Sequence, residues 1–380
     1  MKLAFCLFHY FPYGGLQRDF LRIAKLAEQR GHEVHVYTAR WEGETEPAFH
    51  LHLIEPRGWQ NHTRCVSFAK QLSSLLKEQS CDLVVGFNKL PGLDLYYAAD
   101  VCYQSRAKER HGYWYQLLPR YRHMVALERA VFAAEKPTHI LLIASNQETH
   151  YRQCYQTEPS RFHLLPPGIA KDRMAPSNAA DIRSQVRVGH HVLNDQHVML
   201  MVGSGFKTKG LDRAIKSLAA LPIALRQQTV LWVLGQDHSR CFVRLAEQCG
   251  VAGQVKFLGG RPNVLDYLLA ADVLVHPAYH ENTGTVLLEA LAAGLPVLTV
   301  DVCGYAHYVT EANAGKVLSS PFHQENLTEA LASMLQSSEP IHWRENALAF
   351  ARQADIYSLP EKAMAFIEKM GSQADAIFER

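Results

Sequence analysis

Short apolar segments alternate with helical stretches along this chain, and this alternation constrains its fold more than any other feature. Leu3–Phe8 is a continuous apolar run, as expected of a strand that is buried on both faces of a parallel sheet. Apolar residues then recur at helical spacing as far as Ala27, Gly31 ends the helix, and Glu33–Thr38 is predicted to be a second strand. These segments form one β-α-β unit.

The same alternation continues along the chain, pauses at a stiff connector, Leu164–Ile169, and then restarts. Further strands are predicted at Leu83–Gly86, His139–Ala144, Phe162–Leu165, Val198–Val202, Val230–Gly235, Val255–Gly259, Val273–His276 and Val297–Val300. We therefore expect an α/β protein with two doubly wound, Rossmann-like domains that face each other across a cleft. The predicted domains are residues 1–168 and 169–354, and a C-terminal helix at about 355–380 is expected to complete the first.

Composition excludes several classes of protein. The chain has 39 Lys and Arg against 37 Asp and Glu, and a net charge of +2 argues against a nucleic-acid partner. Eight scattered cysteines without a Cys-x-x-Cys pair indicate the reduced thiols of a cytosolic protein. No run approaches the roughly 18–20 apolar residues that cross a bilayer, so any membrane contact is expected to be peripheral.

Two glycine-rich turns each follow a predicted strand and precede a helix, where backbone amides and the helix dipole favour an anion such as phosphate. The first is Tyr13-Gly14-Gly15, which by itself is more typical of an ordinary turn. The second is Gly203–Gly210, which carries Lys209. Its spacing differs from the P-loop pattern, which disfavours a nucleoside triphosphatase.

The segment from His276 to Val300 contains two glutamates, Glu281 and Glu289, eight residues apart. Within one helix they would be about 12 Å apart along the axis, too far to act on one small group. We therefore expect Glu281 in a loop and Glu289 in the helix after it. That placement suits an extended nucleotide sugar, although an exposed loop acid followed by a helix-surface acid remains the simpler alternative.

Asp19 lies in the first turns of the first predicted helix, near the carboxyl end of the sheet. A carboxylate there is placed to meet a ligand. Acidic residues are also common at helix starts for electrostatic reasons alone, so both interpretations stay open.

Together these motifs resemble the retaining glycosyltransferases of family 4, which have the two-domain B-type fold. The resemblance rests on the Glu-x7-Glu pair followed by Ala-Gly-Leu-Pro-Val, the Gly-Gly turn, the Lys209-Gly210 loop and the Pro-Pro-Gly-Ile connector. Segments spread over nearly the whole chain, including FPYGGLQRDF, GFNKLPGLDLYYAADVCY, GSGFKTKGLDR and VCGYAHY, further resemble the members that add glucose to an inner-core heptose of lipopolysaccharide.

The resemblance implies an acceptor-side N-terminal domain, a nucleotide-sugar-binding C-terminal domain and α-linked transfer from UDP-glucose. It implies that Glu281 binds the donor glucose, Glu289 the ribose and Arg261 the uracil. Lys209 and the Gly15 amide would bind the diphosphate. With Asp19 and Glu281 as catalytic residues, the implied donor site comprises Gly14, Gly15, Arg173, Gly203, Ser204, Lys209, Arg261, Asn282, Thr283, Gly284 and Glu289.

The phosphate loop departs from the family at one position. The broader family commonly carries an arginine just after the loop glycine, whereas this chain has Ser204. We expect Arg173 or Lys207 to supply that charge. The chain has no Asp-x-Asp pair and no histidine motif with a full ligand set, so neither a metal nor another cofactor is expected.

A cationic, aromatic segment runs from Tyr103 to Phe132, and such composition favours anionic lipid headgroups at the water-lipid boundary. We expect it to hold the protein on the cytoplasmic face of the inner membrane, close to a lipid-linked core oligosaccharide acceptor. A solvated helix pair is the alternative. The residues expected to contact membrane or acceptor are Lys89, Arg106, Lys108, Arg110, Trp114, Arg120 and Arg122.

Two other functions fit the same donor site. A nucleotide-sugar epimerase on this scaffold would change the sugar in the absence of any acceptor. A noncatalytic, membrane-associated sensor would bind the nucleotide sugar without consuming it.

Overall fold

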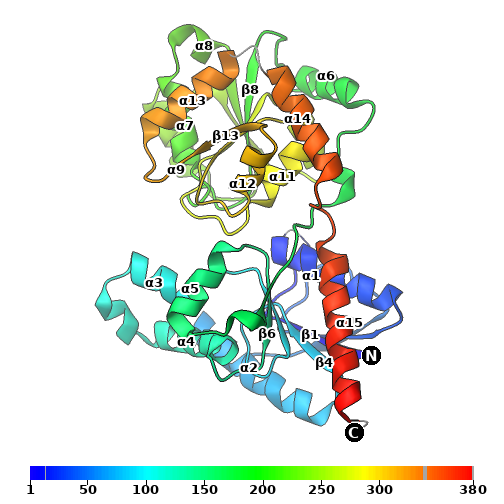
Figure 1. Cartoon of the computed structure of the whole chain (residues 1–380). Helices are drawn as coiled ribbons and strands as arrows, with labels where there is room; N and C mark the ends of the chain where they lie inside the picture. The colour runs from blue at the N-terminus through cyan, green and yellow to red at the C-terminus, as the bar shows by residue number, and fades with distance from the viewer. Residues whose placement is uncertain (13, 337–339, 379–380) are drawn as a thin grey trace. The chain divides into compact units, whose positions relative to one another are not determined.

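The computed structural model describes residues 1–12, 14–336 and 340–378, so Tyr13 lies outside the described residues. The chain divides into two compact units: Met1–Gly168 with Ser358–Arg380, and Ile169–Tyr357. Each unit is a parallel sheet with helices on both faces (Figure 1). The predicted class, two doubly wound α/β domains, is therefore confirmed.

The first unit has a seven-stranded sheet in the order β3-β2-β1-β4-β5-β6-β7. Its strands are β1 (Lys2–Leu7), β2 (Glu33–Thr38), β3 (Phe49–Leu53), β4 (Leu83–Gly86), β5 (Leu95–Ala98), β6 (His139–Leu142) and β7 (Phe162–Leu164). The second unit has six strands in the order β10-β9-β8-β11-β12-β13. They are β8 (His197–Val202), β9 (Thr229–Leu234), β10 (Val255–Gly259), β11 (Val273–His276), β12 (Val297–Val300) and β13 (Gly315–Leu318).

Both sheets share one topology, in which the chain order reverses between the first strand and the fourth. The reversal lies between β1 and β4 in the first unit and between β8 and β11 in the second. Loops that leave the carboxyl ends of strands at such a reversal diverge to opposite faces, which opens a crevice where ligands bind. Strand order therefore indicates where each unit can hold a ligand.

Helices connect the strands and cover both faces of each sheet. Those of the first unit are α1 (Gly15–Gln29), α2 (Asn61–Glu78), α3 (Tyr103–Arg110), α4 (Pro119–Phe132), α5 (Asn146–Tyr155) and α15 (Leu359–Phe378). Those of the second are α6 (Ala179–Gly189), α7 (Leu211–Ala220), α8 (Ile223–Gln227), α9 (Arg240–Gln248), α10 (Val264–Ala270), α11 (Thr285–Ala292), α12 (Ala306–Glu311), α13 (Gln324–Gln336) and α14 (Pro340–Gln353). Short 3₁₀ turns, among them η1 (Tyr113–Leu117), complete the connections.

Alternating side chains of the central strand belong to different cores, as expected of a strand buried on both faces. Leu3 and Phe5 pack in the core beneath α1 and α15, whereas Ala4 and Cys6 pack in the core beneath α2 and α4. Helix α15 contacts α1 and runs beside it (Figure 1). The end of the chain thus contributes to the first unit's core.

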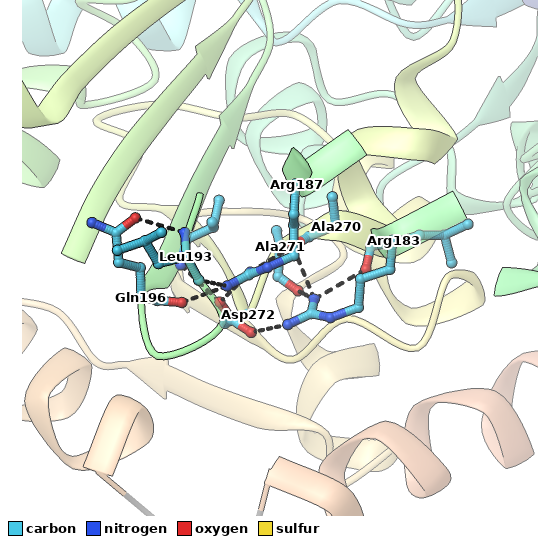
Figure 2. A network of polar contacts seen from close by, with 9 residues as sticks. Arg183, Arg187, Leu193, Gln196, Ala270, Ala271 and Asp272 are labelled. Carbon is cyan, nitrogen blue, oxygen red and sulfur yellow. Dashed lines mark hydrogen bonds and ion pairs between the residues drawn. The ribbon is translucent and has the colours of Figure 1, made fainter. Parts of the chain in front are cut away.

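Two arginines of α6 fasten that helix to the second sheet (Figure 2). Arg183 donates hydrogen bonds to the backbone oxygens of Ala270 and Ala271 at the end of α10, and both Arg183 and Arg187 pair with Asp272. Asp272 also accepts a 2.7 Å hydrogen bond from the backbone N–H of Val198 at the start of β8. Cations thereby satisfy the free carbonyls of a helix C-terminus, where the dipole favours positive charge.

Candidate active site

The loops after β8 and β11 meet at the reversal of the second sheet. Gly210 has φ +78°, and a Cβ at this position would lie 2.1 Å from the backbone oxygen of Pro277. Only glycine permits this close approach without a shift of the backbone. The backbone N–H of Tyr279 donates a 2.8 Å hydrogen bond to the backbone oxygen of Thr208, and this bond joins the two loops directly.

This contact brings together three charged or polar side chains. The Lys209 ammonium pairs with the Glu281 carboxylate, and the same carboxylate oxygen lies 3.1 Å from Nε2 of the buried His276. Burial alone would raise the pKa of Glu281, but the hydrogen bond with His276 and the charge of Lys209 lower it to about 2. Glu281 is therefore a carboxylate throughout the physiological range.

Glu281 lies in the loop before α11, and Glu289 lies within that helix, as the spacing of the two residues predicted. The backbone of Glu281 forms an isolated bridge with Cys303, which fixes the loop against the segment after β12. Burial is the main reason that the pKa of the Cys303 thiol is raised to about 12. The thiol beside Glu281 therefore stays neutral.

Glu289 is buried, and Arg173 is the cation beside it. The Arg173 Nε atom lies 3.8 Å from the Glu289 carboxylate. This Nε is buried and has no hydrogen-bond partner among the residues that the structure describes. Arg173 thus places its charge beside the second glutamate, while the paired cation of Glu281 is Lys209.

The other residues of this unit that were predicted to bind the donor follow strands β8, β10 and β11. Gly203 and Ser204 directly follow β8, and the Ser204 hydroxyl accepts a 3.2 Å hydrogen bond from the backbone N–H of Gln236. Asn282, Thr283 and Gly284 connect Glu281 to α11. Arg261 follows β10, where it is exposed, and its Nε donates to the backbone oxygen of Leu258.

The first unit places its own predicted residues at the start of α1. Gly14 is the N-cap and Gly15 the first helical residue. Asp19, one turn further on, accepts a 2.7 Å hydrogen bond from the hydroxyl of Tyr97 in β5. Burial raises the pKa of Asp19, and the Tyr97 hydrogen bond offsets only part of that effect.

Comparison with known proteins identifies the family. A model of glycosyltransferase family 4 matches residues 13–173, and a model of group 1 glycosyl transferases matches residues 184–354. The chain is 48% identical over 368 residues to the lipopolysaccharide glucosyltransferase WaaG of Escherichia coli K12, with 97% of this chain and 98% of the relative covered. The chain belongs to the WaaG family of glycosyltransferases. This confirms the resemblance that the sequence motifs carried.

Solved structures agree with the WaaG family assignment. A crystal structure of WaaG, a glycosyltransferase involved in lipopolysaccharide biosynthesis, has a TM-score of 0.91 at 48% identity and covers 96% of this chain and 99% of its own. The structure of Anabaena Alr3699/HepE in complex with UDP and glucose has a TM-score of 0.75 at 16% identity, covers 97% of this chain and 99% of its own, and shares the fold. This chain therefore has the two-domain B-type fold of glycosyltransferases.

Sequence motifs alone did not assign a role to every residue of this site. The sequence gives His276 no role, because a single histidine beside a loop has no distinctive spacing, yet His276 contacts Glu281. A pocket of about 200 Å³ at the carboxyl ends of β1 and β2 was also missed. His9, Arg40 and Arg64 line it, and they lie too far apart in the sequence to form a motif.

One predicted surface residue is not at the surface. The Lys89 side chain is only 12% exposed, and its ammonium lies 2.5 Å from the buried carboxylate of Glu128. The expected contact of Lys89 with membrane or acceptor is therefore corrected to an internal ion pair. Glu128 also accepts hydrogen bonds from the backbone N–H groups of Tyr103 and Gln104 at the start of α3, so the ion pair anchors this helix.

The rest of the cationic, aromatic segment covers α3, η1 and α4. Its aromatic tip is strongly exposed, with Tyr113 at 74% and Trp114 at 80%. Of the predicted cations, Lys108, Arg120 and Arg122 are exposed, Arg106 is partly buried, and the side chain of Arg110 lies outside the described residues. Within the described parts of the chain, no helix combines the length and apolar character that crossing a bilayer requires.

Proposed function

We propose that this chain transfers glucose from UDP-glucose to an inner-core heptose of lipopolysaccharide, with an α linkage and retention at the anomeric carbon. One observation carries the proposal: Lys209, Glu281 and His276 converge at the strand reversal of the second unit. The comparison adds support, because this chain is 48% identical to a relative named as a lipopolysaccharide glucosyltransferase.

The charges of this site suit the cleavage of a sugar from a diphosphate. Breaking the bond between the anomeric carbon and the diphosphate leaves negative charge on the leaving group and positive charge on the sugar ring. In our proposal the Lys209 ammonium turns from Glu281 to the diphosphate, and Glu281 then accepts hydrogen bonds from glucose hydroxyls. The acceptor hydroxyl attacks from the same face, and its proton goes to the leaving phosphate.

The other residues bind the nucleotide. Glu289 accepts hydrogen bonds from the ribose hydroxyls, and Arg173 beside it adds positive charge near the diphosphate. Gly15 at the start of α1 in the first unit offers a backbone N–H at a helix N-terminus, where an anion such as a diphosphate is favoured. Arg261 is exposed after β10, so the face of its planar guanidinium is accessible and can stack on uracil.

Metal independence is part of the proposal, because the chain has no Asp-x-Asp pair. Lysine, arginine and backbone amides would neutralise the diphosphate in place of a bridging ion. Activity that a chelator abolishes and that manganese or magnesium restores would contradict this.

The pocket in the first unit suits an anionic part of the acceptor. Arg40 follows β2, Arg64 lies in the first turn of α2, and both line the pocket with His9. Guanidinium groups bind phosphate with two parallel hydrogen bonds, so a phosphorylated core sugar fits this lining. We place the lipopolysaccharide acceptor there.

The exposed segment around Trp114 would hold the enzyme on the cytoplasmic face of the inner membrane. Its aromatic tip suits the interfacial region, and Lys108, Arg120 and Arg122 suit anionic headgroups. Vesicles with and without anionic lipid, at low and high salt, test this. Binding should require anionic lipid, weaken with salt and fall in the Trp114→Ser variant; binding that ignores both lipid charge and salt would reject it.

A donor panel tests the function directly. Purified enzyme is incubated with heptose-terminated core lipid and UDP-glucose, UDP-galactose or other nucleotide sugars, and the product is analysed by mass spectrometry and NMR. We expect glucose transfer with an α anomeric signal. Incubation with donor alone separates the alternatives, since an epimerase would change the sugar and a noncatalytic sensor would leave it intact even with acceptor present.

A further inference from the structure

A cluster of imidazole and carboxylate groups lies on one face of the first sheet, at its β3 edge. Glu33 and His35 are two residues apart in β2, so both side chains point to the same face. His50 of β3 is the cross-strand partner of His35, and their rings stack at 4.6 Å. His52 follows on the same face of β3 and stacks against Tyr37.

Three of these side chains lie close enough together to bind one ion after small movements. The Glu33 carboxylate oxygen lies 2.6 Å from Nε2 of His35 and 3.8 Å from Nε2 of His50. One ligand atom from each residue lies within 4.8 Å of the other two. Zinc binds nitrogen and carboxylate oxygen at about 2.0–2.2 Å in a tetrahedron, which separates two ligand atoms by roughly 3.4 Å.

Little movement is needed to close the set. His35 is 6% exposed and fixed in the sheet, whereas Glu33 and His50 are exposed and can adjust around it. His52 supplies the outer contact: its Nε2 lies 2.9 Å from Nδ1 of His35. The Glu33 carboxylate accepts a hydrogen bond from Nε2–H of His35. A zinc ion would replace that proton, and Nδ1–H of His35 would then donate to His52.

We propose that Glu33, His35 and His50 bind a zinc ion, with His52 as a positioning residue for His35. Glu33 is the first residue of β2, so the site lies toward the amino ends of the strands. The pocket lined by His9 and Arg40 and the Gly14-Gly15 turn follow the carboxyl ends of the strands. The ion therefore joins the edge strand β3 to β2 as a structural element, and it is independent of glycosyl transfer.

The same sheet offers a matched control near its opposite edge. His139 of β6 and His163 of β7 are not register partners but contact each other diagonally, with Nδ1 and Nε2 3.0 Å apart. Phe366 of α15 packs against both rings. Among the described residues, no third ligand completes a set of this kind around that pair. Two histidines alone are not expected to hold zinc tightly.

The test is a zinc titration of the full-length chain after removal of metals by a chelator. Calorimetry should find one tight site per chain in the wild type and in His163→Ala. Binding at that site should weaken at least tenfold in Glu33→Gln and in His50→Ala, and about tenfold in His52→Ala. Cobalt(II) should give the visible absorption of a low-coordinate site only in chains that keep Glu33 and His50.

Stability and activity give the second readout. Zinc should raise the wild-type Tm by roughly 2–4 °C through preferential binding to the folded chain, and should leave the Tm of Glu33→Gln/His50→Ala unchanged. Both single variants should keep full transferase activity without zinc, which shows that they fold. A double variant that binds zinc like the wild type, or equal loss in His163→Ala, would overturn the proposal.

Discussion

The two units each hold a carboxylate near the strand ends where their sheets reverse, but the two groups have opposite electrostatics. Glu281 of the second unit is paired with Lys209 and His276, which lower its pKa to about 2. Asp19 of the first unit accepts a hydrogen bond from the Tyr97 hydroxyl, and burial raises its pKa. Burial raises the pKa of both groups, so the outcome depends on the neighbours: the His276 hydrogen bond and the Lys209 charge outweigh burial at Glu281, whereas the Tyr97 hydrogen bond and the charges of Arg18 and Arg22 do not outweigh it at Asp19.

This difference separates two chemical roles. A carboxylate that remains ionised at every working pH suits the stabilisation of positive charge on a sugar ring. A carboxyl group whose pKa is raised is more easily protonated, which suits the exchange of a proton. We infer that Glu281 acts as a fixed charge and that Asp19 is the more easily protonated of the two.

The largest expected effect comes from breaking the ion pair of the second unit. Glu281→Gln and Lys209→Met should each lower kcat/KM at least a hundredfold, on the order of 3 kcal/mol of transition-state stabilisation. Steady-state kinetics with UDP-glucose and core lipid measure this. Glu247→Gln, an exposed glutamate of α9, is the matched control and should be nearly neutral. Near-normal turnover of either site variant would remove both residues from the mechanism.

The pH dependence of the stability of Glu281→Gln tests whether the ion pair lowers the pKa of Glu281. The folded pKa of Glu281 lies below the unfolded value of about 4.3, so its stabilising contribution is present above pH 4.3 and is lost as the pH falls toward 2. Urea unfolding should therefore find the variant less stable than the wild type at pH 7, with the difference shrinking below about pH 4.

A third buried carboxylate, Glu128, tests whether neighbouring cations and hydrogen bonds also outweigh burial outside the candidate active site. Burial would raise its pKa, but the charge of Lys89 lowers it. Lys89→Met would leave this buried charge without its cation and should reduce the unfolding free energy by about 3 kcal/mol. Arg129→Met, an exposed cation of the same α4, is the control. A loss below about 1 kcal/mol in Lys89→Met would mean that the backbone hydrogen bonds of α3 suffice to hold Glu128.

Sequence patterns predicted the fold well where strands are apolar throughout. Continuous apolar runs located β1, β4, β11 and β12, because strands covered by helices on both faces contain few polar residues. Three strands were missed. β3 reads FHLHL at a sheet edge and β13 reads GKVL, so polar residues interrupt both runs. β5 reads LYYA and was missed although it is apolar.

The site could be predicted only in part, for a topological reason. Lys209 and Glu281 were identified from separate motifs, but they are 72 residues apart, and their pairing depends on β8 and β11 being neighbours. Likewise, the sequence predicted that Lys89 contacts membrane or acceptor, because no local pattern indicates that Glu128 lies beside it. Strand order and helix packing, which bring distant residues together, are not encoded in local spacing.

The smallest effect is expected at Asp19. Its folded pKa is raised above the unfolded value, so the charged form is disfavoured by folding and stability falls as the pH rises through the folded pKa. Asp19→Asn removes that charge and keeps an oxygen that accepts from Tyr97, so it should stabilise the chain at pH 7 by under about 1 kcal/mol and be neutral near pH 3. Urea unfolding at the two pH values measures this, and kinetics of the same variant should reveal reduced transfer. A variant that loses stability at pH 7 would mean that Asp19 has a charged partner as effective as Lys209, and the contrast between the two units would disappear.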